Sequence, residues 1–340
     1  MPSRIFQYLS GAALGALTAL TLTACQQDQP TSPSNGSGTD GEAIIDFELT
    51  PAGAAAAKAS MMVGTHGLPT IPLREQTLSR INASVGWVDN SPFDLSYSGG
   101  PVVKAATHYV IYVNCVAPET PGTCWGNGPL APANFLRDLN ASEYLRLVNE
   151  YIGADARLKF PVAASMRTTA TFATPKRATL QEIQHIVSDA ITAAGGATGY
   201  AGMYHVFLPK GTEVCIVAGN CYSPSDPASW AFCAFHGSVN FGPTQHVLFT
   251  VQPYQGVDGC QWPGQTPQGL IDATGSTLAH EVLETITDPD FDAWSNGLFG
   301  FEISDMCSTF SSNLLLNTRQ YFLQSQYSNT KHMCTTQAPA

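Results

Sequence analysis

Three short runs of β-branched and aromatic residues do most to limit the folds open to this chain. They are HYVIYVN (108–114), MYHVFLP (203–209) and HVLFTVQ (246–252). Runs of this length and composition are typical of β-strands. We therefore predict three strands here, the first of them buried within a sheet.

Amphipathic segments lie between these runs. Across 133–151 and again across 179–194, apolar residues recur at the spacing of one helix face, and Gly195 follows the second segment as a helix stop. Strands that alternate with helices indicate a layered α/β domain, with a mixed sheet and flanking helices. We assign this single domain to residues 90–340, which is long enough to build a substantial core.

Residues 1–24 have the three parts of a secretory signal peptide. Arg4 supplies the positive start, residues 11–22 form an apolar run, and small residues precede Cys25. The LTAC ending resembles the lipobox of bacterial lipoproteins. That resemblance implies cleavage before Cys25, a lipid on its sulfur, and an exported chain anchored to the cell membrane or outer membrane. A plain secretory peptide with an incidental cysteine is the alternative.

Two further segments precede the domain. Residues 25–42 are predicted to be a flexible tether, because QQDQPTSPSNGSGTDG (26–41) has no aliphatic or aromatic residue to bury. Residues 43–89 follow as a lead-in segment.

The cysteines predict a disulfide-containing domain. The chain has nine, and setting Cys25 aside leaves an even number, which in an exported protein indicates up to four disulfides of undetermined connectivity. No C-x-x-C pair is present, so zinc bound by cysteines is disfavoured. The simplest pairing joins sequence neighbours: Cys115–Cys124, Cys215–Cys221, Cys233–Cys260 and Cys307–Cys334.

Several classes of function are disfavoured. The formal net charge of −11 argues against a nucleic-acid partner. No G-x-S-x-G motif supports a serine hydrolase. A cysteine nucleophile does not fit a chain whose thiols are expected to be oxidised.

The segment STLAHEVLETITDP (276–289) carries the clearest chemistry. As a helix over 276–288 it has one apolar face, and His280 and Glu284 stand one turn apart on the other, where both can bind one metal ion. Glu281 lies beside them, in the position of a general base in zinc peptidases that have the His-Glu-x-x-His motif. Pro289 ends the helix. An ordinary solvated polar face is the alternative.

Two more carboxylates follow within about twenty residues. Glu302 comes 18 positions after Glu284, a distance at which gluzincin-type peptidases place a third, glutamate ligand. Asp305 is expected to be a fourth ligand or to orient the others. Ordinary loop solvation or helix capping is the alternative for both residues.

The stretch TLAHEVLETITDPDFDAW…FEISDMC resembles the signature of the exordium, or phosphate-induced, protein family of plants and its bacterial relatives. DLSYSGGPVVKAATHYVIYVNC (94–115) and FCAFHGS (232–238) resemble two further family segments, so the likeness covers about 95–307. The family's tryptophan-rich segment is reduced here to GCQW (259–262), and residues 308–340 depart from the plant pattern. The resemblance implies a link to growth and cell-wall responses, without a defined reaction.

His236 lies in FCAFHGS, close to Cys233. We expect it either to act in catalysis, by donating a hydrogen bond to a substrate carbonyl, or to be an additional metal ligand. A packed histidine beside a disulfide is the alternative.

Two functions remain. The first is a lipid-anchored metallohydrolase, in the first place a peptidase, with zinc as the expected ion, although two carboxylate ligands also suit harder ions. His280, Glu284, Glu302 and Asp305 would bind the metal, and Glu281 would take a proton from the attacking water.

The second is a non-catalytic surface module that binds cell-wall polysaccharide or a protein partner and contains a structural ion. The state of Glu281 separates the two. A general base should be free and face a cleft, whereas a structural role would leave its carboxylate held in a buried hydrogen bond or ion pair.

The lipobox predicts how the protein is anchored. Cys25→Ser removes the sulfur that would carry the lipid, so the variant should move from the membrane fraction to the soluble exported fraction. Fractionation followed by immunoblotting measures this. Unchanged membrane association of Cys25→Ser would contradict the lipoprotein assignment.

Overall fold

The computed structural model describes most of the chain from residue 93 onward and short pieces before it. Cys25, Cys124 and the predicted signal peptide lie outside the described residues. All described residues belong to one compact unit, Pro33–Ala340. The described residues are 35–37, 43–50, 59–62, 93–115, 131–217, 219–226, 231–257, 260, 267–297, 300–308 and 310–339.

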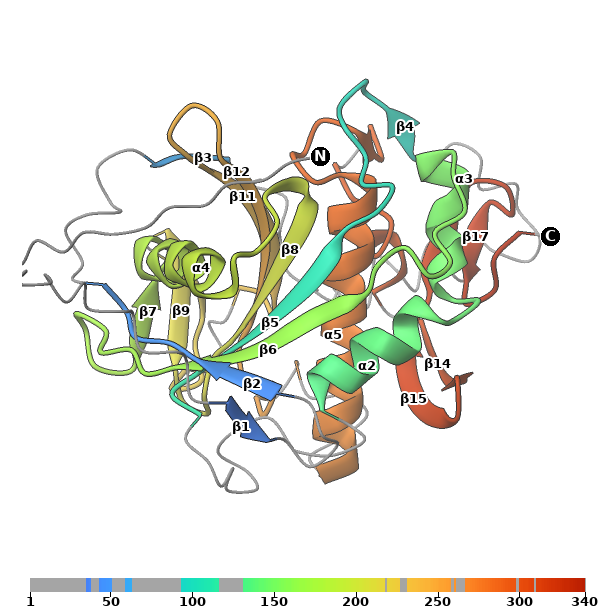
Figure 1. Ribbon diagram of the computed structural model, residues 1–340. Helices are drawn as coiled ribbons and strands as arrows, with labels where there is room; N and C mark the ends of the chain where they lie inside the picture. The colour runs from blue at the N-terminus through green and yellow to red at the C-terminus, as the bar shows by residue number, and fades with distance from the viewer. Residues whose placement is uncertain are drawn as a thin grey trace, which may run out of the picture. The chain divides into compact units, whose positions relative to one another are not determined.

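An eight-stranded mixed sheet forms the centre of this unit (Figure 1). Its order is β1-β2-β6-β5-β8-β12-β11-β3, with β2, β6, β5, β8 and β12 parallel and the others antiparallel to their neighbours. The three predicted strands are confirmed as β5, β8 and β12, which are adjacent in the sheet. The strands are β1 (Asn35–Ser37), β2 (Ala43–Asp46), β3 (Ala59–Met62), β5 (Thr107–Val113), β6 (Val162–Thr168), β8 (Gly199–Phe207), β11 (Phe235–Phe241) and β12 (His246–Gln252).

The sheet reaches further towards the N-terminus than the boundary at residue 90. Strands β2 and β3 lie in the 43–89 segment and pair with β6 and β11, and β1 lies in the 25–42 segment. Each of these strands has at most four residues, AIID and ASMM being the longer two. So short a run carries too little alternation to be told apart from a linker.

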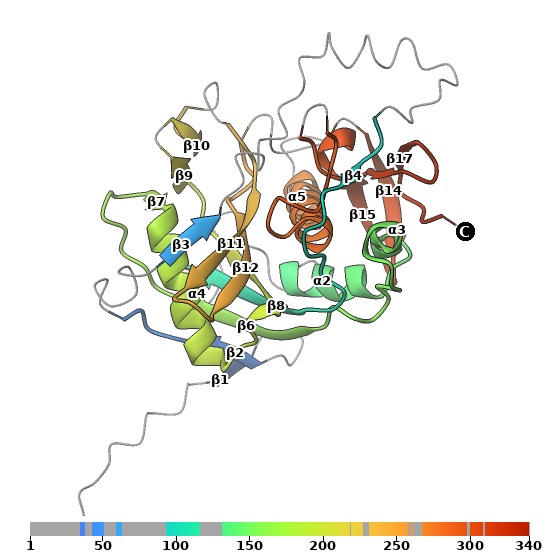
Figure 2. The same ribbon diagram turned by 90° about the horizontal axis from the view of Figure 1, so that it is seen from above.

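Helix α4 (Leu180–Ala194) covers one face of the sheet (Figure 2). It begins with a capping box, in which Thr179 accepts the Glu182 N–H and Glu182 accepts the Thr179 N–H. It ends at Gly195, whose φ of 56° is left-handed. The predicted helix over 179–194 is therefore confirmed.

The opposite face is covered by helices from two parts of the chain. The predicted helix over 133–151 is interrupted, because the Ser142 hydroxyl donates to the Leu139 carbonyl and accepts the Leu145 N–H. The pieces are α2 (Pro132–Asn140), η3 (Leu145–Val148) and α3 (Asn149–Ile152).

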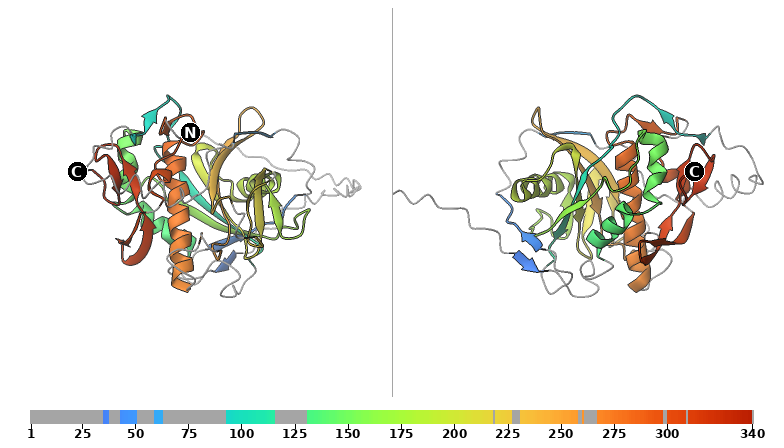
Figure 3. Two further views of the ribbon diagram at one scale, coloured as in Figure 1. Left: turned by 180° about the vertical axis from the view of Figure 1, so that it is seen from behind. Right: turned by 45° about the vertical axis from the view of Figure 1, so that its right-hand side comes forward.

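Helix α5 (Pro267–Thr287) lies on this same face and is the central helix of the unit. It starts nine residues before the predicted helix over 276–288 and ends before Pro289, as expected. The sheet lies on one side of α5 and the hairpin of β14 (Ser311–Leu316) and β15 (Arg319–Gln324) on another (Figure 3).

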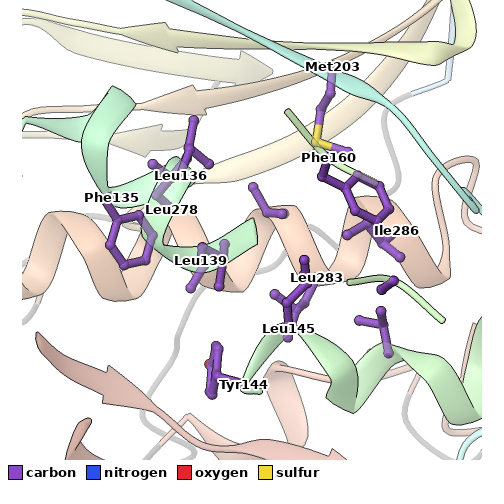
Figure 4. Close-up of a cluster of buried hydrophobic side chains, with 14 of the residues drawn as sticks. Phe135, Leu136, Leu139, Tyr144, Leu145, Phe160, Met203, Leu278, Leu283 and Ile286 are labelled. Atoms are coloured by element: carbon purple, nitrogen blue, oxygen red, sulfur yellow. The ribbon is translucent and has the colours of Figure 1, made fainter. Parts of the chain in front are cut away.

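The C-terminal half of α5 is buried on all sides. Its apolar side packs on α2, η3 and the sheet, with Leu278, Leu283 and Ile286 among the side chains in contact there (Figure 4). On the hairpin side, Asp272 accepts the Phe322 N–H. Every residue from 278 to 290 is buried. The polar face of this helix is thus not a solvated surface.

Disulfides join parts of this unit. The predicted pairs Cys215–Cys221, Cys233–Cys260 and Cys307–Cys334 are present, and Cys115 is also disulfide-bonded. They indicate an oxidising environment outside the cytoplasm. Among the described residues, no helix is both long and apolar enough to cross a bilayer.

Two buried histidines lie on the α5 side of the sheet. His108 Nδ1 is 2.7 Å from His205 Nε2, and His205 Nδ1 is 2.9 Å from the Thr250 hydroxyl. Burial lowers the pKa of His108 to about 3 and that of His205 well below its usual value. Both imidazoles are therefore neutral in the folded protein at neutral pH.

This pair predicts sensitivity to acid. Because the unfolded chain protonates these histidines below pH 6.5 and the folded chain does not, the stability they support is lost as the pH falls from 6.5 towards 3. Each should contribute a slope of about 1.4 kcal/mol per pH unit in this window. Thermal unfolding of His205→Gln between pH 7 and 5 should show a shallower loss than the wild type. Gln320→Met, at an exposed site without a titratable group, should keep the wild-type slope, and equal slopes for the wild type and both variants would refute the prediction.

Candidate metal centre

The polar side of α5 faces strand β11 and the turn at 302–305. On β11, Phe235 and Val239 point to the α4 side of the sheet, so the alternation of the strand directs His236 towards α5. Glu302 and Asp305 reach the same place from the turn after β13 (Trp294–Ser295). Residues from three distant segments therefore meet on one side of the helix.

One set of ligands forms around His280. Its Nε2 lies 3.0 Å from Glu284 Oε1 and 3.5 Å from Asp305 Oδ1. These three atoms lie close enough together to bind one metal ion. The i, i+4 pair predicted from the sequence thus has a third partner in Asp305.

The hairpin determines which nitrogen of His280 is available. The Gln324 amide nitrogen donates to the Ser304 carbonyl, which can only accept, so Gln324 Oε1 is the atom 3.2 Å from His280 Nδ1. An acceptor there requires a proton on Nδ1. In the neutral ring Nε2 therefore has the lone pair, and it faces Glu284 and Asp305, as a metal ligand requires.

A second set of ligands forms around His236. Its Nδ1 lies 3.3 Å from Glu281 Oε2 and 3.7 Å from Glu284 Oε2. These atoms too could bind one metal ion. Glu284 belongs to both sets, with one carboxylate oxygen in each.

The sequence predicts that Glu302 binds the same ion as His280 and Glu284. In the structure Glu302 does not belong to the ligand set around His280. Its Oε1 is 3.7 Å from His236 Nε2, on the far side of that ring from Glu281. The side chain is 1% exposed, and neither carboxylate oxygen has a hydrogen-bond partner among the described residues. Its main-chain N–H donates to Asp305 Oδ2 at 3.3 Å and so helps to orient that ligand.

Burial perturbs the ionisation of these groups. It raises the pKa of Glu284 to about 7, with Asp305 and Glu281 adding to the rise and His280 opposing it. It also raises the pKa of Glu302 well above the usual value, and that of Asp305 to a lesser extent. Burial lowers the pKa of His280, but the neighbouring carboxylates outweigh it and the net shift is upward. Clusters of this kind are concentrated at functional sites.

The Glu281 carboxylate is held in place. The residue is 4% exposed, and its contact with His236 is a buried one. A carboxylate held in a buried pair is the state expected of a structural ion site rather than of a free general base. The pairing with an imidazole also creates a proton-transfer pair, for which the sequence carries no signal.

The loop after α5 covers the centre. Phe291 stacks on the His236 ring with centroids 4.7 Å apart, and its φ of 60° is left-handed. The segment around Gly100 crosses this loop, with the Gly100 N–H donating to the Asp292 carbonyl at 2.8 Å. A Cβ on Gly100 would lie 2.6 Å from the main-chain carbonyl carbon of Asp292, so only glycine allows this approach.

The three motif segments identified in the sequence therefore converge. Segment 94–115 crosses the loop after α5 at Gly100, segment 232–238 supplies His236, and segment 276–307 supplies the other ligands. No protein-family model, curated protein or solved structure matches this chain. The resemblance to the exordium family rests on the motifs.

The sequence offered no signal for Gln324 or Phe291. Gln324 lies in a C-terminal segment without a motif, and its role depends on the packing of the hairpin against α5. Phe291 is one of several aromatic residues in its segment, and only the left-handed turn directs it onto His236.

Gln324 is predicted to raise metal affinity. Gln324→Met keeps the size of the side chain but removes the hydrogen bond that fixes the His280 tautomer. Affinity for Zn²⁺ or Mn²⁺ should fall about 10- to 100-fold, as measured by competition with a chromophoric chelator. Gln320→Met, at an exposed position of the same strand, is the control. Equal affinities in the two variants would show that Gln324 does not position the ligand.

Proposed function

We propose that this protein is an exported metal-dependent hydrolase, anchored by a lipid on Cys25 and acting on peptide bonds of proteins or of the cell wall. One observation carries the proposal. A three-ligand set, His280, Glu284 and Asp305, lies beside a carboxylate–imidazole pair, Glu281 and His236. The exordium-like motifs support a role at the cell surface.

The donor set suits a catalytic ion. Catalytic zinc sites use three protein ligands and keep one position open, whereas structural sites use four. One imidazole and two carboxylates suit zinc and also harder ions such as Mn²⁺. When bound, such an ion polarises a carbonyl and makes water a better nucleophile.

Glu281 and His236 would transfer the proton. Glu281 is adjacent to the ligand His280 and accepts the proton of the attacking water. His236 Nδ1, at 3.3 Å from Glu281 Oε2, keeps that carboxylate oriented and can pass the proton to the leaving amine. Phe291, stacked on His236, limits the access of bulk water to this pair.

The burial of the centre favours a second candidate, a structural ion in a non-catalytic surface module. His236, Glu281, Glu284 and Glu302 are each at most 4% exposed. Under this alternative, the Glu281–His236 contact only neutralises charge. The ion would then stabilise the fold without turnover.

Glu281→Gln separates the two candidates. It keeps the shape of the side chain but removes the base, so a catalytic role predicts a loss of about 10²- to 10⁴-fold in kcat with the His280 ion retained. Cleavage of a fluorogenic peptide library by the metal-loaded chain provides the assay. Gln320→Met is the control for any activity lost during purification and metal loading.

The opposite results are equally specific. A wild-type chain that retains its ion but cleaves no peptide, and whose Tm falls on chelation, would support the structural ion. Full activity in Glu281→Gln would remove Glu281 from the mechanism.

A further inference from the structure

Glu284 is the one residue shared by both ligand sets. We infer that the centre binds two divalent ions, bridged by the Glu284 carboxylate. The first is the ion of the proposed function, at His280, Glu284 and Asp305, and the inference rests on that proposal for this ion alone. The second is held by His236, Glu281 and Glu284.

The two oxygens of Glu284 point to different imidazoles. Oε1 is 3.0 Å from His280 Nε2, and Oε2 is 3.7 Å from His236 Nδ1. Ligand atoms about 2.0–2.2 Å from a common ion are themselves roughly 3.0–3.7 Å apart. Each oxygen therefore has the spacing of a ligand in its own set. A carboxylate used in this way bridges two ions, as in two-metal sites with ions about 3.5–4 Å apart.

The charge of the cluster is the second argument. Five carboxylates lie within it, and none of the described ion pairs brings a lysine or arginine to them. With neutral imidazole ligands the ionised cluster has a formal charge of −5, which one divalent ion reduces to −3 and two reduce to −1. Uncompensated buried charge is costly, so the second ion removes most of the remaining penalty. The carboxylates are Glu281, Glu284, Asp288, Glu302 and Asp305.

Buried polar atoms without hydrogen-bond partners lie in the same centre. His236 Nε2 and both oxygens of Glu302 are buried and have no hydrogen-bond partner among the described residues. An ion on His236 Nδ1 requires the proton of that ring on Nε2, which faces Glu302 Oε1. This is the position from which a carboxylate orients a metal-binding histidine. Glu302 then acts through His236 rather than as a ligand of the first ion.

With the second ion on His236 Nδ1, that nitrogen no longer carries the proton to the leaving amine, and Glu281 performs both proton transfers. Its Oε2 is the oxygen that faces His236 and belongs to the second set. Its Oε1 is left to accept the proton of the attacking water.

One further group among the described residues has metal-like spacing: Glu213, Cys215 and Cys221. It is not a candidate metal site, because its two sulfurs form a disulfide.

Metal counting on the full chain tests the inference. Apo-protein titrated with Co²⁺ should show two binding steps, and elemental analysis after dialysis should give close to two ions per chain. Two Co²⁺ ions bridged by a carboxylate couple magnetically, so the EPR signal per ion should fall at the second equivalent. These measurements on the wild type do not depend on how any variant folds.

Variants assign the ions to their sets. His236→Asn should reduce the count to one and remove the coupling, and His280→Asn should also leave one. Glu284→Gln should weaken both sites at least tenfold. The control is His185→Gln on α4, a histidine outside both sets, which should keep two ions. Circular dichroism and a thiol count verify that each variant is folded and oxidised.

The outcomes separate the two proposals. A single ion that His280→Asn removes and His236→Asn leaves in place overturns the second site and leaves the proposed function standing. A single ion that only His236→Asn removes overturns both the two-ion centre and the placement of the catalytic ion. No ion at all overturns both proposals, with protons shared among the carboxylates as the means of neutralisation.

Discussion

Buried negative charge on helix α5 is the constraint on which the rest of this structure depends. The helix presents Glu281 and Glu284 to the core rather than to water, and the turn after it adds Glu302 and Asp305. Carboxylates in such a setting need compensation by cations, protons or metal ions. The imidazoles of His236 and His280 are the only partners that the described ion pairs bring to them. Divalent ions are the compensation that also uses both histidines as ligands.

The surrounding fold holds these side chains in position. Strand β11 brings His236 from the sheet side, while the β14–β15 hairpin brings Gln324 from the other and fixes the tautomer of His280. The Cys307–Cys334 disulfide joins the turn that carries Asp305 to the C-terminal segment. The C-terminal region, which departs from the exordium pattern, is thus part of the support of the site.

The contact between Glu281 and His236 can be interpreted in two ways, and each interpretation supports a different function. Glu281 paired with His236 is what a structural ion site would show, and under the proposed function the same pair is a base with an adjacent proton acceptor. The geometry of the three-ligand set around His280 favours catalysis, because a purely structural ion does not need so many ionisable groups beside it. The burial of the centre favours the structural role. Measurement of turnover, rather than further geometry, distinguishes them.

Local spacing in the sequence determined those features of the structure that do not depend on how the elements pack. These were strands β5, β8 and β12, helix α4 with its stop at Gly195, the Cys215–Cys221 disulfide, and the i, i+4 pair His280 and Glu284. Each depends on residues that are close in the chain or on the fixed period of one element.

Tertiary structure alone decided the rest: the burial of the polar face of α5, the pairing of Glu281 with His236, the position of Glu302 and the role of Gln324. His236 and Glu281 are 45 residues apart, and His280 and Gln324 are 44 apart. Sheet order and the docking of the hairpin bring such residues together, and no periodicity in the sequence encodes either.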